Sequence, residues 1–250
     1  MHTDYRNYQA NPTALADKVI VVTGAGDGIG KQAATSYAGL GASVILLGKT
    51  VEKLERTYDA IKADGGNAAI IPIDFRGANR QHYHDMANTL LAEYGRVDGL
   101  LFNAGQLGNL CPFEQIKESE FEQVMQVNLN SQFLMTQAFL PALRAAKQAS
   151  VVFTTSSVGR KARAFWGTYA ISKFATEGMM QVLADEHKRS TIRFNCINPG
   201  ATRTDMRAKA YPGEVASTLK TPADIMPAYL YLMSDDSASV NGESLDCQAK

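Results

Sequence analysis

The sequence predicts a single α/β domain built on a doubly wound parallel sheet of about seven strands, with helices on both faces. Short apolar, β-branched segments alternate with helix-length segments along nearly the whole chain, which is typical of this class. The longest apolar segments are apolar on both faces, as parallel strands covered by helices must be. No internal repeat, low-complexity tract or interdomain linker interrupts the 250 residues, so one domain is expected.

The elements follow in order along the chain. Strands are expected at 18–24, 42–48, 67–74, 97–105, 149–156, 192–200 and, more weakly, 243–247. Helices are expected at 28–40, 51–64, 79–94, 119–147, 166–189 and 222–233. Pro141 should kink the fourth helix. Residues 1–17 precede the first strand as an N-terminal extension, and residues 18–250 form the domain.

Composition excludes several classes of partner. Lys plus Arg and Asp plus Glu both number 25, so neither a nucleic acid nor an anionic membrane is expected as a partner. No segment is apolar over the length of a membrane span or a signal peptide, so we expect a cytoplasmic protein. The cysteines and histidines lack metal-ligand spacing, so no metal site is expected and Cys111, Cys196 and Cys247 are interpreted as reduced structural thiols.

Ligands of such sheets bind beyond the carboxyl ends of the strands, so the residues that follow each strand are candidates for a ligand site. After the first strand, "TGAGDGIG" places Gly24, Gly28 and Gly30 at the start of a helix. Glycines allow close approach of a pyrophosphate, and the helix N-terminus offers unpaired N–H groups. A glycine-rich turn that only packs helix on strand is the alternative, but the strand–turn–helix context favours a dinucleotide.

Lys49 follows the second strand, where an acid would favour NAD and a base the 2′-phosphate of NADP. NADP is therefore favoured, with NAD possible, although Asp27 could lie near the same phosphate and Lys49 could simply begin a solvated loop. Asp74 ends the third strand and could accept a hydrogen bond from an adenine or cap the following turn. In "FNAG" after the fourth strand, Gly105 permits approach of a ribose, while Asn103 could bind the cofactor or pin the strand.

The fifth strand ends in Ser156, and Tyr169 and Lys173 follow on a helix. Four residues apart, the tyrosine and the lysine share one helix face. An ammonium near a phenol should lower its pKa from about 10 by one to three units, which would suit general acid–base catalysis. Ser156 could donate a hydrogen bond to a substrate oxygen. An ordinary surface tyrosine and lysine are the alternative, and the dinucleotide loop on the same sheet edge favours chemistry.

The sixth strand ends in "NPGATRT", where Pro199 and Gly200 force a turn and Thr202 and Thr204 offer donors toward a cofactor. A plain strand exit is the alternative. The polar segment 205–220, with its Pro-Gly pair, is expected to form a mobile substrate lid.

Together these motifs resemble the short-chain dehydrogenase/reductase family over essentially the whole chain from Lys18, and most of all its YciK-like bacterial oxidoreductases. "TGAGDGIG" matches the family's TGxxxGxG loop, "YAISK" matches YxxxK, and Ser156 stands thirteen residues before Tyr169. The resemblance implies a Rossmann-type fold and a catalytic Asn128 in "MQVNLNSQF". It also places Ile29 and Ala104 beside the cofactor. The ending "NGESLDCQAK" departs from the family's usual Asp-Gly-Gly, which puts tail contacts between subunits in doubt.

The resemblance implies an NAD(P)-dependent oxidoreductase acting on a carbonyl compound or secondary alcohol. Tyr169 would move the proton, Lys173 would hold the nicotinamide ribose, Ser156 would orient the carbonyl and Asn128 would support a proton path. A homodimer or homotetramer is implied too, with apolar residues of the catalytic helix either at the seam or in the core (Phe174, Met179 and Met180). The alternatives are a catalytically silent nucleotide-binding sensor or scaffold and, more remotely, a methyltransferase.

Five residues between Ser156 and Tyr169 are expected to border the substrate pocket: Arg160, Lys161, Arg163, Phe165 and Trp166. Their charges would suit an anionic or amphipathic substrate, and solvated loop charges are the alternative.

Overall fold

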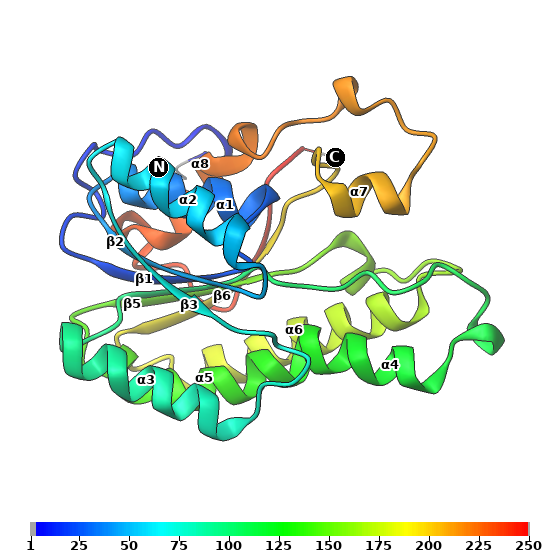
Figure 1. The fold of residues 1–250 in the computed structure, drawn as a ribbon, viewed down its shortest axis with the longest axis horizontal. Helices are drawn as coiled ribbons and strands as arrows, with labels where there is room; N and C mark the ends of the chain where they lie inside the picture. The colour runs from blue at the N-terminus through cyan, green and yellow to red at the C-terminus, as the bar shows by residue number, and fades with distance from the viewer. Residues whose placement is uncertain (1–3, 250) are drawn as a thin grey trace.

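A computed structural model describes residues 4–249, and it confirms the predicted fold class (Figure 1). Seven parallel strands form one sheet in the order β3-β2-β1-β4-β5-β6-β7. The strand bounds are β1 Val19–Thr23, β2 Ser43–Gly48, β3 Asn67–Pro72, β4 Gly99–Phe102, β5 Ala149–Thr154, β6 Ile192–Asn198 and β7 Ser244–Asp246. Because the chain crosses from β3 back to the far side of β1, the strand order reverses between β1 and β4, where a ligand crevice is expected.

Helices cover both faces of the sheet. The bounds are α1 Gly28–Gly39, α2 Val51–Ala63, α3 Arg80–Tyr94, α4 Glu118–Met125, α5 Ser131–Arg144, α6 Gly167–Glu186, α7 Asp205–Ala210 and α8 Met226–Met233. Figure 1 shows α1, α2 and α8 on one face and α3, α4, α5 and α6 on the other. Each layer buries its own apolar cluster against the sheet, which explains why β1, β4, β5 and β6 are buried at every position.

The predicted strands extend two or three residues beyond their observed ends at several places. β3 ends at Pro72 and β4 at Phe102, which leaves Asp74 and Asn103 in the turns that follow. The weakly predicted last strand is present as the three-residue β7, paired in parallel with β6. These shorter strands place the polar residues in loops at the sheet edge.

The expectation of one continuous helix over 119–147 is wrong. Residues Gln126–Asn130 form a π-helical turn between α4 and α5, while α5 continues past Pro141 to Arg144. The hydroxyl of Ser131, the first residue of α5, donates back into this turn to the Val127 carbonyl at 2.7 Å. A π-turn adds one residue per helical turn and is frequent at functional sites; here it contains Asn128.

The N-terminal extension packs on α8. Tyr8 is buried, its ring lies 5.4 Å from that of Tyr231, and its hydroxyl donates to Asp236 at 2.7 Å. Leu15 is fully buried in the same apolar cluster as α8. The described part of the extension therefore covers one face of the domain.

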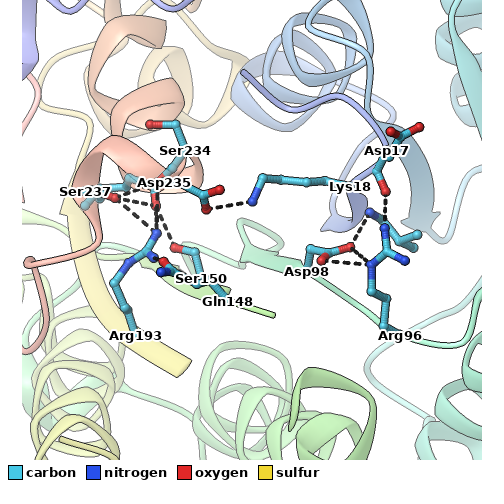
Figure 2. Close-up of polar contacts among 12 residues, drawn as sticks. Asp17, Lys18, Arg96, Asp98, Gln148, Ser150, Arg193, Ser234, Asp235 and Ser237 are labelled. Atoms are coloured by element: carbon cyan, nitrogen blue, oxygen red, sulfur yellow. Dashed lines mark hydrogen bonds and ion pairs between the residues drawn. The ribbon is translucent and has the colours of Figure 1, made fainter. Parts of the chain in front are cut away.

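Polar contacts tie the amino ends of the strands to neighbouring segments (Figure 2). Arg193 of β6 is buried, and its guanidinium donates to the Ser234 carbonyl at 3.0 Å and the Ser237 hydroxyl at 3.2 Å. Asp98 accepts from Arg96 and from the amide of Val19 at 2.8 Å. Charged side chains thus satisfy backbone groups at the edge opposite the strand ends where a ligand is expected.

Candidate active site and cofactor cleft

Two adjoining cavities lie at the carboxyl ends of the strands, around the switch between β1 and β4. Their volumes are about 310 and 280 Å³. Four residues line both, so the two form one continuous cleft: Gly24, Asp27, Ala104 and Gly105. We name the parts the catalytic cavity, which contains Tyr169, and the distal cavity, which contains Lys49.

The glycine loop forms the shared wall. A Cβ at Gly30 would lie 2.2 Å from the Gly24 carbonyl oxygen and 2.6 Å from the Asn103 amide nitrogen, so this position admits only glycine. Gly28 has a φ of +51° and faces the Thr204 methyl group. Asp27 caps α1 by accepting from the Gly28 amide at 2.7 Å. The loop therefore brings the N-terminus of α1 to the cleft, as an anion site requires.

Charges of both signs line the distal cavity. The carboxylate of Asp27 pairs with Lys53, which holds the pKa of Asp27 low. Asp74 accepts from the Arg76 guanidinium at 2.6 Å and from its amide at 3.1 Å, so it caps its turn, and this bond holds its pKa low. Among the residues that the structure describes, Lys49 makes no ion pair. It remains available to an anionic ligand.

Tyr169 and Ser156 lie together in the catalytic cavity. Burial raises the pKa of the Tyr169 phenol to about 12, and a hydrogen bond with Ser156 acts against this rise. The expectation of a lowered pKa is therefore wrong for the chain by itself, because desolvation outweighs every favourable contact. The neighbouring Ser157 is exposed and does not line the cavity.

Lys173 lies one helical turn beyond Tyr169, with 3 % of its surface exposed. Its Nζ donates to the Thr154 carbonyl at 2.7 Å and lies 5.5 Å from the centre of the Tyr169 ring. Burial lowers the pKa of Lys173 to about 8, although Cys196 and Glu177 act in the opposite direction. The ammonium therefore faces the ring and a main-chain oxygen of β5.

Asn128 is fully buried and lines neither cavity. Its side chain accepts from the Gln106 amide at 2.7 Å and donates to the Gln106 carbonyl at 2.9 Å and the Ser172 hydroxyl at 3.0 Å. A Cβ at Gly105 would lie 3.5 Å from the Asn128 oxygen and 3.9 Å from Lys173 Nζ. Asn128 thus holds the loop after β4 against the helix that carries Tyr169.

The turn after β6 closes the other side of the catalytic cavity. Thr202 is buried and donates back to the Pro199 carbonyl at 3.2 Å, while Thr204 caps α7 by accepting from the Arg207 amide at 3.2 Å. Gln248 clamps this turn, because its amide donates to the carbonyls of Pro199 at 2.9 Å and Ala201 at 3.0 Å.

Most of the predicted site residues meet in this cleft. Those that line it are Gly24, Gly28, Ile29, Lys49, Asp74, Asn103, Ala104, Gly105, Ser156, Tyr169, Lys173, Pro199, Gly200, Thr202 and Thr204. Of the expected pocket-border residues, only Trp166 lines the catalytic cavity; Arg160, Lys161, Arg163 and Phe165 do not. Arg160 instead pairs with Asp246 and lies 4.0 Å from Glu177.

Sequence reasoning missed several wall residues of the catalytic cavity, notably Leu107, Met206 and Arg207, and the clamp formed by Gln248. In the distal cavity, the sequence could have indicated Lys53, because it follows Lys49 by four residues at the start of a helix. The others come from loops whose approach depends on the tertiary fold.

A search of residues 4–249 finds no group of three or more metal-ligating side chains and no helix long and apolar enough to cross a membrane. The three cysteines are free thiols in the structure.

Comparison with known proteins agrees with this geometry. The family model described as short chain dehydrogenase matches residues 18–214. The chain is 50% identical over 243 residues to the uncharacterized oxidoreductase YciK of Escherichia coli K12, covering 97% of this chain and 96% of that protein. This similarity confirms the YciK-like resemblance.

Solved structures agree as well. A short chain dehydrogenase from Shigella flexneri 2a in complex with NADP has a TM-score of 0.93 at 49% identity, covering 96% of this chain and 100% of that one. A short chain dehydrogenase from E. coli CFT073 in complex with NADPH gives the same values. With the glycine loop, the Ser-Tyr-Lys constellation and the parallel sheet in place, the chain belongs to the short-chain dehydrogenase/reductase family of oxidoreductases.

Proposed function

We propose that the protein is an NADP-dependent oxidoreductase that transfers a hydride between the cofactor and a carbonyl compound or secondary alcohol, with Tyr169 as the general acid–base. The observation that carries this proposal is that Ser156, Tyr169 and Lys173 line the same cavity as the glycine loop. A dinucleotide held by that loop would bring its reactive end to the phenol.

The residues present fit an NADP molecule. Gly30 lets the N-terminus of α1 pack against the Gly24 carbonyl, and Gly24 and Gly28 line the cavity in front of that N-terminus, where a pyrophosphate would bind. Lys49 is available for the additional phosphate of NADP, and Lys53 is adjacent in the distal cavity. The complexes of the two relatives with NADP and NADPH support the same cofactor. When bound, the nicotinamide supplies or accepts the hydride.

The chain's own residues would handle the proton and the orientation. Tyr169, with its raised pKa, is protonated at neutral pH and can donate to a carbonyl oxygen held by Ser156. Lys173 would steady the nicotinamide ribose and favour the phenolate that remains after transfer. Asn128 would hold the loop at Gln106 against Ser172 of α6, and so maintain the spacing of a proton path.

The test is a comparison of binding and turnover. NADPH titration should show tight binding to the wild type and to Tyr169→Phe, and only the wild type should reduce carbonyl compounds at a measurable rate. Tyr94→Phe, at the end of α3 and outside both cavities, is the matched control and should keep full activity. Turnover retained by Tyr169→Phe would contradict the assigned role, and failure to bind NADPH would favour a non-catalytic protein.

We further propose that residues 18–250 act as one dinucleotide-binding and catalytic domain, with 205–220 as the substrate lid. Two features support a lid: α7 lines the catalytic cavity through Met206 and Arg207, and Thr202 bridges to Lys220 at the end of the segment. Limited proteolysis with and without NADPH and substrate should show protection within 205–220.

A homodimer or homotetramer is also proposed. Large apolar side chains of α4, α5 and α6 remain exposed (Phe121, Phe133, Ile171, Phe174 and Val182). Met180 is fully buried in the core and cannot belong to a seam, whereas Phe174 is 45 % exposed. Light scattering of the wild type and of Phe174→Ser tests the assembly.

The three free thiols suit a reducing compartment, so we propose a cytoplasmic location, which fractionation of cells would check.

A further inference from the structure

The part of the catalytic cavity beyond Ser156 and Tyr169 has an apolar wall. Leu107, Trp166 and Met206 pack together against buried Val158, Tyr169 and Ala170. The Trp166 ring centre lies 5.8 Å from that of Tyr169 and 5.7 Å from that of Tyr211. A carbonyl compound whose oxygen meets Ser156 and Tyr169 would therefore place its substituents against an indole and two aliphatic side chains.

The basic loop residues that favoured an anionic substrate lie outside the catalytic cavity. Arg160 pairs with Asp246, a contact outside the cavity. Arg163 is exposed, and its guanidinium donates to the Tyr211 hydroxyl at 3.4 Å. Lys161 is exposed and lines neither part of the cleft. None of the three basic side chains after Ser156 therefore lines the catalytic cavity.

Arg207 is the arginine that lines the catalytic cavity among the described residues, and its charge is already compensated. Its Nε and Nη2 both bond the Glu214 carboxylate at 2.6 Å, a bidentate pair, and the guanidinium stacks over the Tyr211 ring at 3.8 Å. Asp205 lies in the same wall. A carboxylate substrate would have to displace Glu214 and would approach a second acid, so this wall selects against anions.

We propose, resting on the oxidoreductase function above, that the substrate is an uncharged ketone or secondary alcohol with an apolar ring, and that Trp166 and the Arg207–Glu214 pair set this specificity. The indole packs against the substrate ring. Arg207, already paired with Glu214, is not available to bind the carboxylate of an acidic analogue. Burial of an apolar ring face against the indole corresponds to a preference of about tenfold.

The matched probes are cyclohexanone and its analogue carrying a carboxylate opposite the carbonyl. Trp166 is the only tryptophan of the chain, so its fluorescence reports occupancy of this cavity directly. In the NADP⁺ complex, which cannot reduce a ketone, cyclohexanone should change this fluorescence saturably and the carboxylate should do so at least about tenfold more weakly. With NADPH, kcat/KM should favour cyclohexanone by about tenfold or more.

Two substitutions test the assigned residues. Glu214→Gln frees Arg207, so the preference for cyclohexanone over the carboxylate should shrink about tenfold. Lys161→Gln is the matched control and should leave the ratio at its wild-type value. Trp166→Leu should raise KM for cyclohexanone about tenfold, and Trp166→Phe should restore most of that loss.

The outcomes separate this proposal from the function on which it rests. If the carboxylate is the better substrate, or Lys161→Gln lowers its turnover, the substrate class is wrong while the oxidoreductase function stands. If NADPH binds and neither ketone perturbs Trp166 nor is reduced, the ring-ketone assignment is overturned. If NADPH fails to bind, the proposed function itself fails.

Discussion

Replacing Lys173 with methionine should make the protein more stable while abolishing its activity. The side chain is buried, and burial lowers its pKa from 10.5 to about 8. That gap corresponds to a cost of about 3 kcal/mol for keeping the ammonium charged at neutral pH. Methionine removes this cost but leaves the Thr154 carbonyl without its partner, a loss of about 1 kcal/mol. The net gain in the free energy of unfolding should be about 2 kcal/mol at pH 7.

The sign of the pH dependence follows from the lowered pKa. Between about pH 8 and 10.5 the unfolded chain holds more protons at this position than the folded chain does, so the stability of the wild type rises with pH relative to the variant. The advantage of Lys173→Met should therefore fall to about 1 kcal/mol at pH 9. Burial raises the pKa values of Cys196 and Cys247, which lowers stability over the same window in both proteins. The contribution of Lys173 is therefore obtained from the difference in unfolding free energy between the wild type and Lys173→Met.

The assay is urea unfolding of the cofactor-free protein at pH 7 and pH 9, with Lys62→Met as a control for replacing an exposed lysine. The control should be within about 0.5 kcal/mol of the wild type at both pH values. A Lys173→Met protein that is less stable at pH 7, or whose advantage is the same at both pH values, would refute the assignment of a costly buried ammonium.

Three further substitutions test the cleft. Lys49→Asp should shift the ratio of NADPH to NADH affinity at least about tenfold toward NADH, whereas Lys62→Asp, on α2 and outside both cavities, should not. An unchanged ratio for Lys49→Asp would remove Lys49 from the phosphate site. Gly30→Ala should weaken NADPH binding more than about tenfold, because the added Cβ would lie 2.2 Å from the Gly24 carbonyl oxygen. The control Gly39→Ala, whose added Cβ would have nothing within 4 Å, should bind NADPH normally. It should also gain up to about 1 kcal/mol in the free energy of unfolding. Asn128→Ala should cost about 2 to 4 kcal/mol of unfolding free energy by leaving buried polar groups unpaired, and a loss under about 1 kcal/mol in urea unfolding would contradict this.

The sheet and most of the cofactor cleft were predictable because their signals are local. Buried parallel strands read as continuous apolar segments, and the glycine loop lies between a strand and a helix that the pattern also indicates. The π-helical turn at Asn128 was not predictable, because its partners Gln106 and Ser172 are 22 and 44 residues away. Local periodicity carries no signal for a contact of this kind.

The pKa of Tyr169 was predicted in the wrong direction for a related reason. Spacing on a helix places Lys173 on the same face, but it does not say that Nζ bonds the Thr154 carbonyl or that both side chains are buried. Desolvation depends on everything packed around the pair, including β5 and the loop after β4. The same limit applies to Arg160, whose charge is directed to Asp246 on the last strand.

The raised pKa of Tyr169 determines which protonation state of the phenol begins each direction of the reaction. With a pKa of about 12, the phenolate fraction of Tyr169 at pH 7 is about one in 10⁵. Proton donation to a carbonyl uses the dominant form and needs no prior ionisation. Alcohol oxidation begins from the phenolate, so it requires additional positive charge near the phenol. The Lys173 ammonium, 5.5 Å from the centre of the Tyr169 ring, can supply it. Because burial already lowers the pKa of Lys173 to about 8, this support is lost as the pH rises above 8. Because both directions pass through the same transition state, removing the ammonium should lower kcat/KM for alcohol oxidation and for carbonyl reduction by the same factor.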